Sequence, residues 1–137
     1  LDDGYLAPIY PRGYAHAMAT VNLTKDTFES TVTSGTVLVD FWAAWCGPCR
    51  MFGPVFDAAS EQHPDLTFAK VDTEAEPELA GELGIMGIPT LMVFRDGILL
   101  HNESGALPAP VLEQLIQAVR DVDMDAVRAE VAKQEGA

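Results

Sequence analysis

Basic residues are scarce in this sequence. Its 137 residues include only eight lysines and arginines against 21 aspartates and glutamates, which gives a formal net charge of −13. Such a chain repels nucleic-acid phosphates and anionic lipid surfaces, so we expect neither nucleic acid nor a membrane as a partner. Solubility accounts for the acidic excess better than a specific basic partner does.

Long apolar runs are also absent, and no window comes near the roughly 18 residues of a spanning helix. The N-terminal stretch has no basic region followed by a continuous apolar run, so no secretory signal is predicted. Its Gly, Pro and Tyr residues recur without a period, which indicates a disordered or non-native lead segment over residues 1–19. We take Met18 as the natural start and residues 1–17 as added. The remainder has the length of one domain, residues 20–120, with a C-terminal extension over 121–137 that is helical or frayed.

Cysteine is scarce as well, since only Cys46 and Cys49 occur, both within "FWAAWCGPCR". Two cysteines are too few for a disulfide framework, and a bridge across such a short loop would add little stability. A structural zinc ion needs four ligands, whereas this pair offers two and the three histidines are scattered, so we expect no metal. A dimer that shares two such pairs around a cluster stays open. Within one chain, a redox pair is the remaining explanation.

The apolar pattern predicts strands and helices in alternation, closed by a hairpin at Asp96–Gly97. Strands are predicted over 20–23, 36–43, 65–72, 90–94 and 98–102, and helices over 24–35, 47–59, 76–84 and 108–119. In the second of these helices, Met51 is expected on the apolar face. Strands separated by helices need parallel crossovers, and the hairpin adds an antiparallel pair. An α/β fold with a mixed sheet and helices on both faces follows, in which the first strand lies at an edge and the second is buried on both sides.

Cys46 follows the buried strand and starts the second helix. Unpaired N–H groups and the helix dipole stabilise an anion there, so its thiol should have a lowered pKa and attack as the thiolate. Cys49 lies one turn further and can attack a mixed disulfide formed on Cys46.

The stretches "VDFWAAWCGPCR", "KVDTE" and "GIPTLMVFRDG" together resemble the thioredoxin family over residues 20–120. The resemblance implies a thioredoxin fold, with a mixed five-stranded central sheet flanked by four helices. It also implies a protein dithiol–disulfide oxidoreductase in which Cys46 is the nucleophile and Cys49 the resolving thiol.

The resemblance gives Asp40 the role of proton acceptor for the resolving cysteine and pairs it with Lys70. A carboxylate inside "VLVDFW" is unusual on its own terms, because burial raises the pKa of an acid and suits it to proton transfer near neutrality. The alternatives are an inert Asp40 capped at a strand end and a Lys70 that reaches to water like other surface lysines.

Pro89 matches the family's cis-proline, which lies against the cysteines and leaves the backbone of Ile88 free to pair with a substrate strand. The resemblance implies a shallow docking patch of six residues, namely Trp45, Gly47, Pro48, Gly87, Ile88 and Gly105. Arg50 stands where the family often has lysine. Met86 adds a flexible apolar contact that broadens target choice.

We therefore expect a thioredoxin-type reductase of protein disulfides that works through a reversible Cys46–Cys49 disulfide. It would need no cofactor beyond that disulfide and would receive electrons from a thioredoxin reductase. We expect a cytoplasmic monomer. The alternatives are an oxidant or isomerase of an oxidising compartment, which the missing signal disfavours, and a redox-independent binding or holdase module that uses the same apolar patch.

Overall fold

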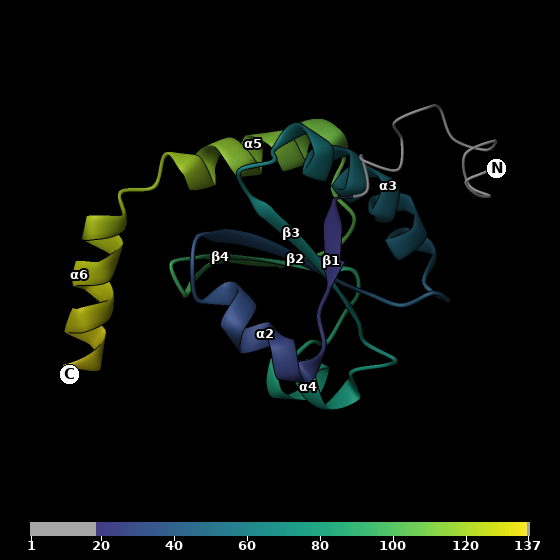
Figure 1. The fold of residues 1–137 in the computed structure, drawn as a ribbon, viewed down its shortest axis with the longest axis horizontal. Coiled ribbons are helices and arrows are strands. Elements are labelled where there is room, and N and C mark those ends of the chain that lie inside the picture. The colour runs from purple at the N-terminus through teal and green to yellow at the C-terminus, as the bar shows by residue number, and fades with distance from the viewer. Residues whose placement is uncertain (1–18, 137) are drawn as a thin grey trace.

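The computed structural model of the protein describes residues 19–136 (Figure 1). The hypotheses about residues 1–17 and Met18 lie outside the described residues. The strands are β1 (Thr20–Asn22), β2 (Thr36–Trp42), β3 (Thr67–Asp72), β4 (Thr90–Arg95) and β5 (Ile98–Ser104). The helices are α2 (Lys25–Val32), α3 (Gly47–Gln62), α4 (Pro77–Glu82), α5 (Ala109–Arg120) and α6 (Met124–Glu135).

The five strands form one mixed sheet in the order β1-β3-β2-β4-β5. The first three pair in parallel, while β4 runs antiparallel to β2 and β5 antiparallel to β4. Figure 1 shows α3 and α5 over one face of this sheet and α2 and α4 over the other. The predicted mixed sheet, the edge position of the first strand and the four flanking helices are confirmed.

Strand alternation divides the core between the two faces of the sheet. In β2, Val37, Val39 and Phe41 pack in the cluster beneath α2 and α4, whereas Leu38 packs in the cluster beneath α3 and α5. Asp40 shares the parity of Leu38 and therefore points toward α3. Asp40 thus places a carboxyl group on the face of β2 that α3 covers.

The hairpin turn between β4 and β5 forms at Asp96 and Gly97, as predicted, with φ values of 53° and 81°. Strand β5 is longer than the predicted 98–102, because Glu103 and Ser104 still pair with residues of β4. The prediction that Met51 belongs to the apolar face of α3 is wrong, since its side chain is 73% exposed.

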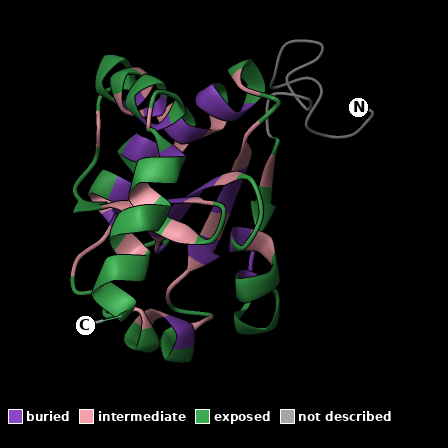
Figure 2. Ribbon diagram, turned by 90° about the vertical axis from the view of Figure 1, so that its left-hand side faces the viewer, coloured by how far each residue is buried: buried purple, intermediate pink, exposed green. Residues whose placement is uncertain are grey.

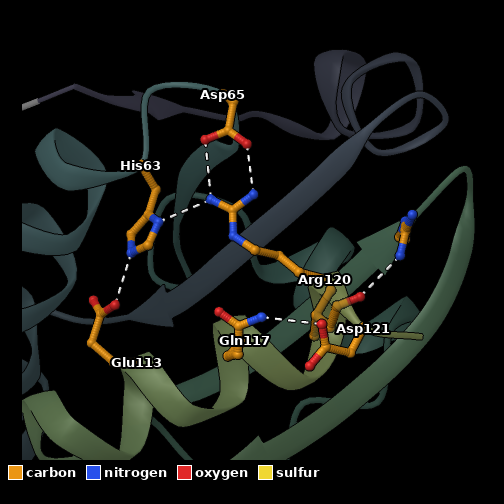
Figure 3. Close-up of polar contacts among 8 residues, drawn as sticks. His63, Asp65, Glu113, Gln117, Arg120 and Asp121 are labelled. Atoms are coloured by element: carbon orange, nitrogen blue, oxygen red, sulfur yellow. Dashed lines mark hydrogen bonds and ion pairs between the residues drawn. The ribbon is translucent and has the colours of Figure 1, made fainter.

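A polar network ties the end of α3 to α5 (Figure 3). The Arg120 guanidinium donates two hydrogen bonds to Asp65, which holds the pKa of that carboxyl at about 2, and a third to Nδ1 of His63. A guanidinium can only donate, so Nδ1 is the acceptor and the proton of His63 is on Nε2. That nitrogen lies 2.8 Å from Glu113 Oε1, so His63 donates to Glu113. The network fixes the far end of the helix that begins at the cysteines.

Helix α6 follows α5 after a short turn, begins at an Asp123 N-cap and is mostly exposed (Figure 2). It is attached through buried Met124 and an ion pair of Arg128 with Asp96 at 3.6 Å. Figure 1 places it at the opposite end of the molecule from the start of α3. Within residues 19–136, none of the helices combines the length and the apolar character needed to cross a membrane.

Candidate active site

Cys46 is the N-cap residue of α3, directly after the loop that leaves β2. Its sulfur accepts a hydrogen bond from the backbone N–H of Cys49 at 3.2 Å, and its thiol donates to the Ile88 carbonyl at 3.7 Å. A helix N-terminus with a free N–H aimed at sulfur is the arrangement that stabilises a negative charge there. The predicted thiolate character of Cys46 stays a prediction.

Cys49 is buried one turn into the helix, and both thiols are free. Burial, followed by the hydrogen bond with Cys46, raises the pKa of the Cys49 thiol to about 12, and the charge of Asp40 contributes in the same direction. Cys49 therefore keeps its proton at neutral pH unless a nearby base removes it. Asp40 is an acidic group close enough for its charge to act on this thiol.

Asp40 and Lys70 are register partners on the adjacent parallel strands β2 and β3, so both side chains leave the sheet on the α3 side. Lys70 Nζ lies 3.9 Å from Asp40 Oδ2. Asp40 is fully buried, and neither of its carboxylate oxygens has a hydrogen-bond partner within residues 19–136. Burial raises the pKa of Asp40 to about 7, against the lowering effect of Lys70.

These contacts bear on the alternatives for both residues. Asp40 stands two positions inside the end of β2 and is not capped, so the inert strand-end interpretation does not fit. The side chain of Lys70 is 18% exposed, and its ammonium lies 3.9 Å from Asp40 Oδ2 and 5.6 Å from the centroid of the Trp42 ring, as the expected pairing with Asp40 requires.

A second carboxylate, which the sequence reasoning missed, belongs to Asp57 of α3. Its Oδ1 lies 3.6 Å from Lys70 Nζ, so the same ammonium has a second carboxylate beside it. The signal was available, since Asp57 follows Cys49 by eight positions, and such a spacing puts both residues on one face of a helix.

The segment around Pro89 closes the site from the far side. The Ile88–Pro89 peptide bond is cis, as the resemblance implied. Ile88 packs against Cys46 and Cys49, and the N–H of Gly105 donates to the Pro89 carbonyl at 2.8 Å. The fold thus brings the segment around Pro89, distant in the sequence, against the two cysteines.

The six predicted patch residues lie on this surface, where Trp45, Pro48 and Gly105 are exposed and Gly47, Gly87 and Ile88 are half-buried. Trp45 is 67% exposed, and the methionines Met51 and Met86 are 73% and 96% exposed. Arg50 donates to the Ala44 carbonyl at 2.9 Å and so braces the loop before Cys46. Met51 was not predicted as part of this surface, because its place in the apolar repeat of α3 indicated burial.

Comparison with known proteins agrees with this geometry. The family model for thioredoxin matches residues 19–133, which reaches beyond the predicted domain into α6. A Streptomyces coelicolor protein named "Putative thioredoxin 2" is 53% identical over 118 residues, covering 85% of this chain and 88% of that protein. Thioredoxin of Bacillus subtilis is 40% identical over 100 residues, or 72% of this chain and 96% of its own, and that of Listeria monocytogenes is 41% identical over 95 residues, or 69% and 92%. The chain belongs to the thioredoxin family and is a protein disulfide oxidoreductase of the thioredoxin type.

Proposed function

We propose that the protein reduces disulfides of other proteins, with Cys46 as nucleophile, Cys49 as resolving thiol and Asp40 as the base that deprotonates Cys49. The observation that carries the assignment is the unpartnered, buried Asp40 carboxyl, with a pKa of about 7, near a thiol whose pKa is about 12. A proton acceptor that titrates near neutrality matches the step that a buried resolving thiol requires.

In the first step the Cys46 thiolate attacks one sulfur of the substrate disulfide. A bond forms between Cys46 and that sulfur, and the substrate S–S bond breaks. The other substrate sulfur leaves with the electron pair as a thiolate and takes a proton from water. The Cys49 N–H that now donates to the Cys46 sulfur supports the anion before attack.

In the second step Asp40 accepts the Cys49 proton and the new thiolate attacks the sulfur of Cys46. The Cys46–Cys49 disulfide forms, the bond from Cys46 to the substrate breaks, and the second substrate sulfur leaves as a thiolate. Two electrons have then passed from the protein dithiol to the substrate disulfide. Lys70 stabilises the carboxylate of Asp40 before it takes up the proton, since their charges are opposite.

The docking patch would hold an extended substrate strand, with backbone bonds to Ile88 next to Pro89 and apolar contacts to Trp45. Support comes from the short approach of Ile88 to Cys46 and from the exposure of Trp45. Cys46 is thereby the thiol that a docked substrate meets first.

The oxidised protein would be returned to the dithiol by a thioredoxin reductase, and the redox disulfide would be its only redox group. Members of this family generally work with such a reductase and with disulfide substrates. We propose a cytoplasmic monomer, since disulfide reduction fits a reducing compartment.

The exposed apolar side chains around Cys46 also favour a second candidate, a chaperone-like binding module that acts independently of redox state. Trp45, Met51 and Met86 offer adaptable apolar contact area without any need for the thiols. Replacement of both cysteines by serine separates the two functions. If the double variant still binds a reduced, unfolded client protein, the binding function is supported. If it no longer binds the client, the binding function is refuted.

Reduction of insulin disulfides tests the reductase, first with dithiothreitol and then with a thioredoxin reductase as electron donor. The wild-type protein should accelerate reduction in both settings, and Cys46→Ser should abolish the acceleration, whereas Ser30→Ala, an exposed change of similar size, should not. No acceleration by the wild-type protein in either setting would refute the reductase activity.

The role of Asp40 has its own test. Asp40→Ala should slow release of the mixed disulfide while the attack by Cys46 proceeds, and unchanged rates for both steps would refute the role of Asp40.

A further inference from the structure

The ammonium of Lys70 lies in a niche on α3 formed by residues four positions apart. Cys49, Gly53 and Asp57 follow one another along one face of the helix. A Cβ atom at Gly53 would stand 3.7 Å from Lys70 Nζ, an ordinary van der Waals contact, so the ammonium lies directly beside this position of the helix. Along the helix, the lysine therefore rests between the resolving thiol and the second carboxylate.

Two carboxylates share this single cation. Lys70 Nζ lies 3.6 Å from Asp57 Oδ1 and 3.9 Å from Asp40 Oδ2, both longer than a hydrogen bond. The side chains of Lys70 and Asp57 are only 18% and 16% exposed, so water screens these charges weakly. Within residues 19–136, Asp57 Oδ1 and both oxygens of Asp40 have no hydrogen-bond partner. Each carboxylate depends on the same ammonium for compensation.

The charged and titratable groups around Asp40 come from two elements, β3 and α3. Lys70 is supplied by β3, Asp57 and Cys49 by α3, and Cys46 caps that helix, while β4 places the apolar Leu91 opposite Asp40. Lys70 favours the ionised form of Asp40, and the negative charge of Asp57 opposes it. Asp57 also attracts the ammonium of Lys70. Its repulsion of the Asp40 charge and its attraction of the ammonium both disfavour the ionised form of Asp40.

We propose that Asp57 is a positioning residue of the thiol–disulfide reaction, which holds the Lys70 ammonium back from Asp40 and so keeps the Asp40 carboxyl able to exchange protons near neutral pH. The proposal rests on the proposed role of Asp40 as the base for Cys49. Asp57 itself touches neither thiol in the mechanism and acts through Lys70.

The test is a titration of the Asp40 carboxyl in the reduced full-length protein, followed by 13C NMR and assigned with Asp40→Asn. Asp57→Asn keeps the shape of the side chain and removes its charge. We expect the Asp40 midpoint to fall by on the order of one pH unit, the effect of one nearby charge in partly screened surroundings. The pH midpoint for release of the mixed disulfide, measured by stopped flow, should fall by the same amount.

Two matched variants separate charge from structure. Asp57→Glu restores the negative charge and should keep the wild-type midpoint. Glu61→Gln removes an exposed carboxylate one turn further along α3 and should leave the midpoint in place. A merely structural role for Asp57 would lower the melting temperature without moving the Asp40 midpoint, and that result would overturn the proposal. Equal shifts for Asp57→Asn and Asp57→Glu would overturn it as well.

The failure of the proposed function would look different. If Asp40→Asn left the pH profile of mixed-disulfide release unchanged, Asp40 would not be the base, whatever its titration showed. If Asp40→Asn removed that pH dependence while Asp57→Asn left the midpoint of the Asp40 titration unchanged, only the proposed role of Asp57 would be refuted.

Discussion

The replacement Asp40→Asn should make the folded protein more stable at alkaline pH, because it removes a buried charge. The Asp40 carboxyl has a pKa near 3.8 in an unfolded chain and about 7 in the folded protein. Between these values the unfolded state binds fewer protons than the folded state, so the free energy of unfolding falls as the pH rises. The cost of the buried carboxylate is fully present above the folded pKa.

The magnitude follows from the size of that shift. A difference of about three pKa units corresponds to about 4 kcal/mol against the folded state when Asp40 is fully ionised. By the linkage relation, about 2–3 kcal/mol of this loss develops between pH 5 and pH 8. The asparagine side chain of the variant cannot ionise, so the variant lacks this contribution at every pH. The unpartnered amide of that asparagine costs roughly 1–3 kcal/mol, which leaves a net gain of about 1–3 kcal/mol at pH 8.

Urea unfolding of the reduced protein at pH 5, 6, 7 and 8, followed by tryptophan fluorescence, measures the effect. The stability difference between Asp40→Asn and wild type should grow in favour of the variant by about 2–3 kcal/mol across this range. Glu29→Gln removes an exposed carboxylate from α2 and should show no such growth. A difference that is independent of pH, or a variant less stable than wild type at pH 8, would refute the account of Asp40 as a buried, unpartnered acid.

Three further changes test the framework that holds the site. Phe56→Ala empties a fully buried position between α3 and the sheet and should cost about 3–5 kcal/mol in urea unfolding; a loss below about 1 kcal/mol would contradict the packing described. Arg95→Met removes the donor to the carbonyls of Val119 in α5 and Val122 in the turn before α6, and it should cost about 1–3 kcal/mol while insulin reduction stays at the wild-type rate. A loss of turnover would contradict the separation of α6 from the site. Gly97→Ala forces a side chain into a backbone with a φ of 81° and should cost about 1 kcal/mol, whereas Gly81→Ala in α4 should not destabilise; equal effects would contradict the turn geometry.

Most of the fold was predictable from local pattern. The run of β-branched and aromatic residues in β2 and the Asp96–Gly97 turn each admit few alternatives, and their positions agree with the structure. The end of β5 was less predictable, because Glu103 and Ser104 are polar and only their pairing with β4 shows that the strand continues. Met51 was misassigned because it satisfies the apolar spacing of α3 yet lies one position beyond the buried face.

The site was predictable only in part from its own residues. The spacing of Cys46 and Cys49 and the polar interruption at Asp40 are visible in the sequence. Their link to Lys70 depends on the register of β2 with β3, which no local pattern specifies. Asp57 was missed although its spacing from Cys49 places it on the same face of α3, because an aspartate on a helix is ordinary until the ammonium beside it is known.

The central claim is that Cys46 attacks the substrate and Cys49 resolves the mixed disulfide. Mass spectrometry of single-cysteine variants incubated with oxidised insulin tests it most directly. Cys49→Ser should accumulate a stable covalent adduct through Cys46, while Cys46→Ser, whose remaining thiol has a raised pKa and keeps its proton, should accumulate none. An adduct that formed on Cys49 as readily as on Cys46 would contradict the assignment of both roles.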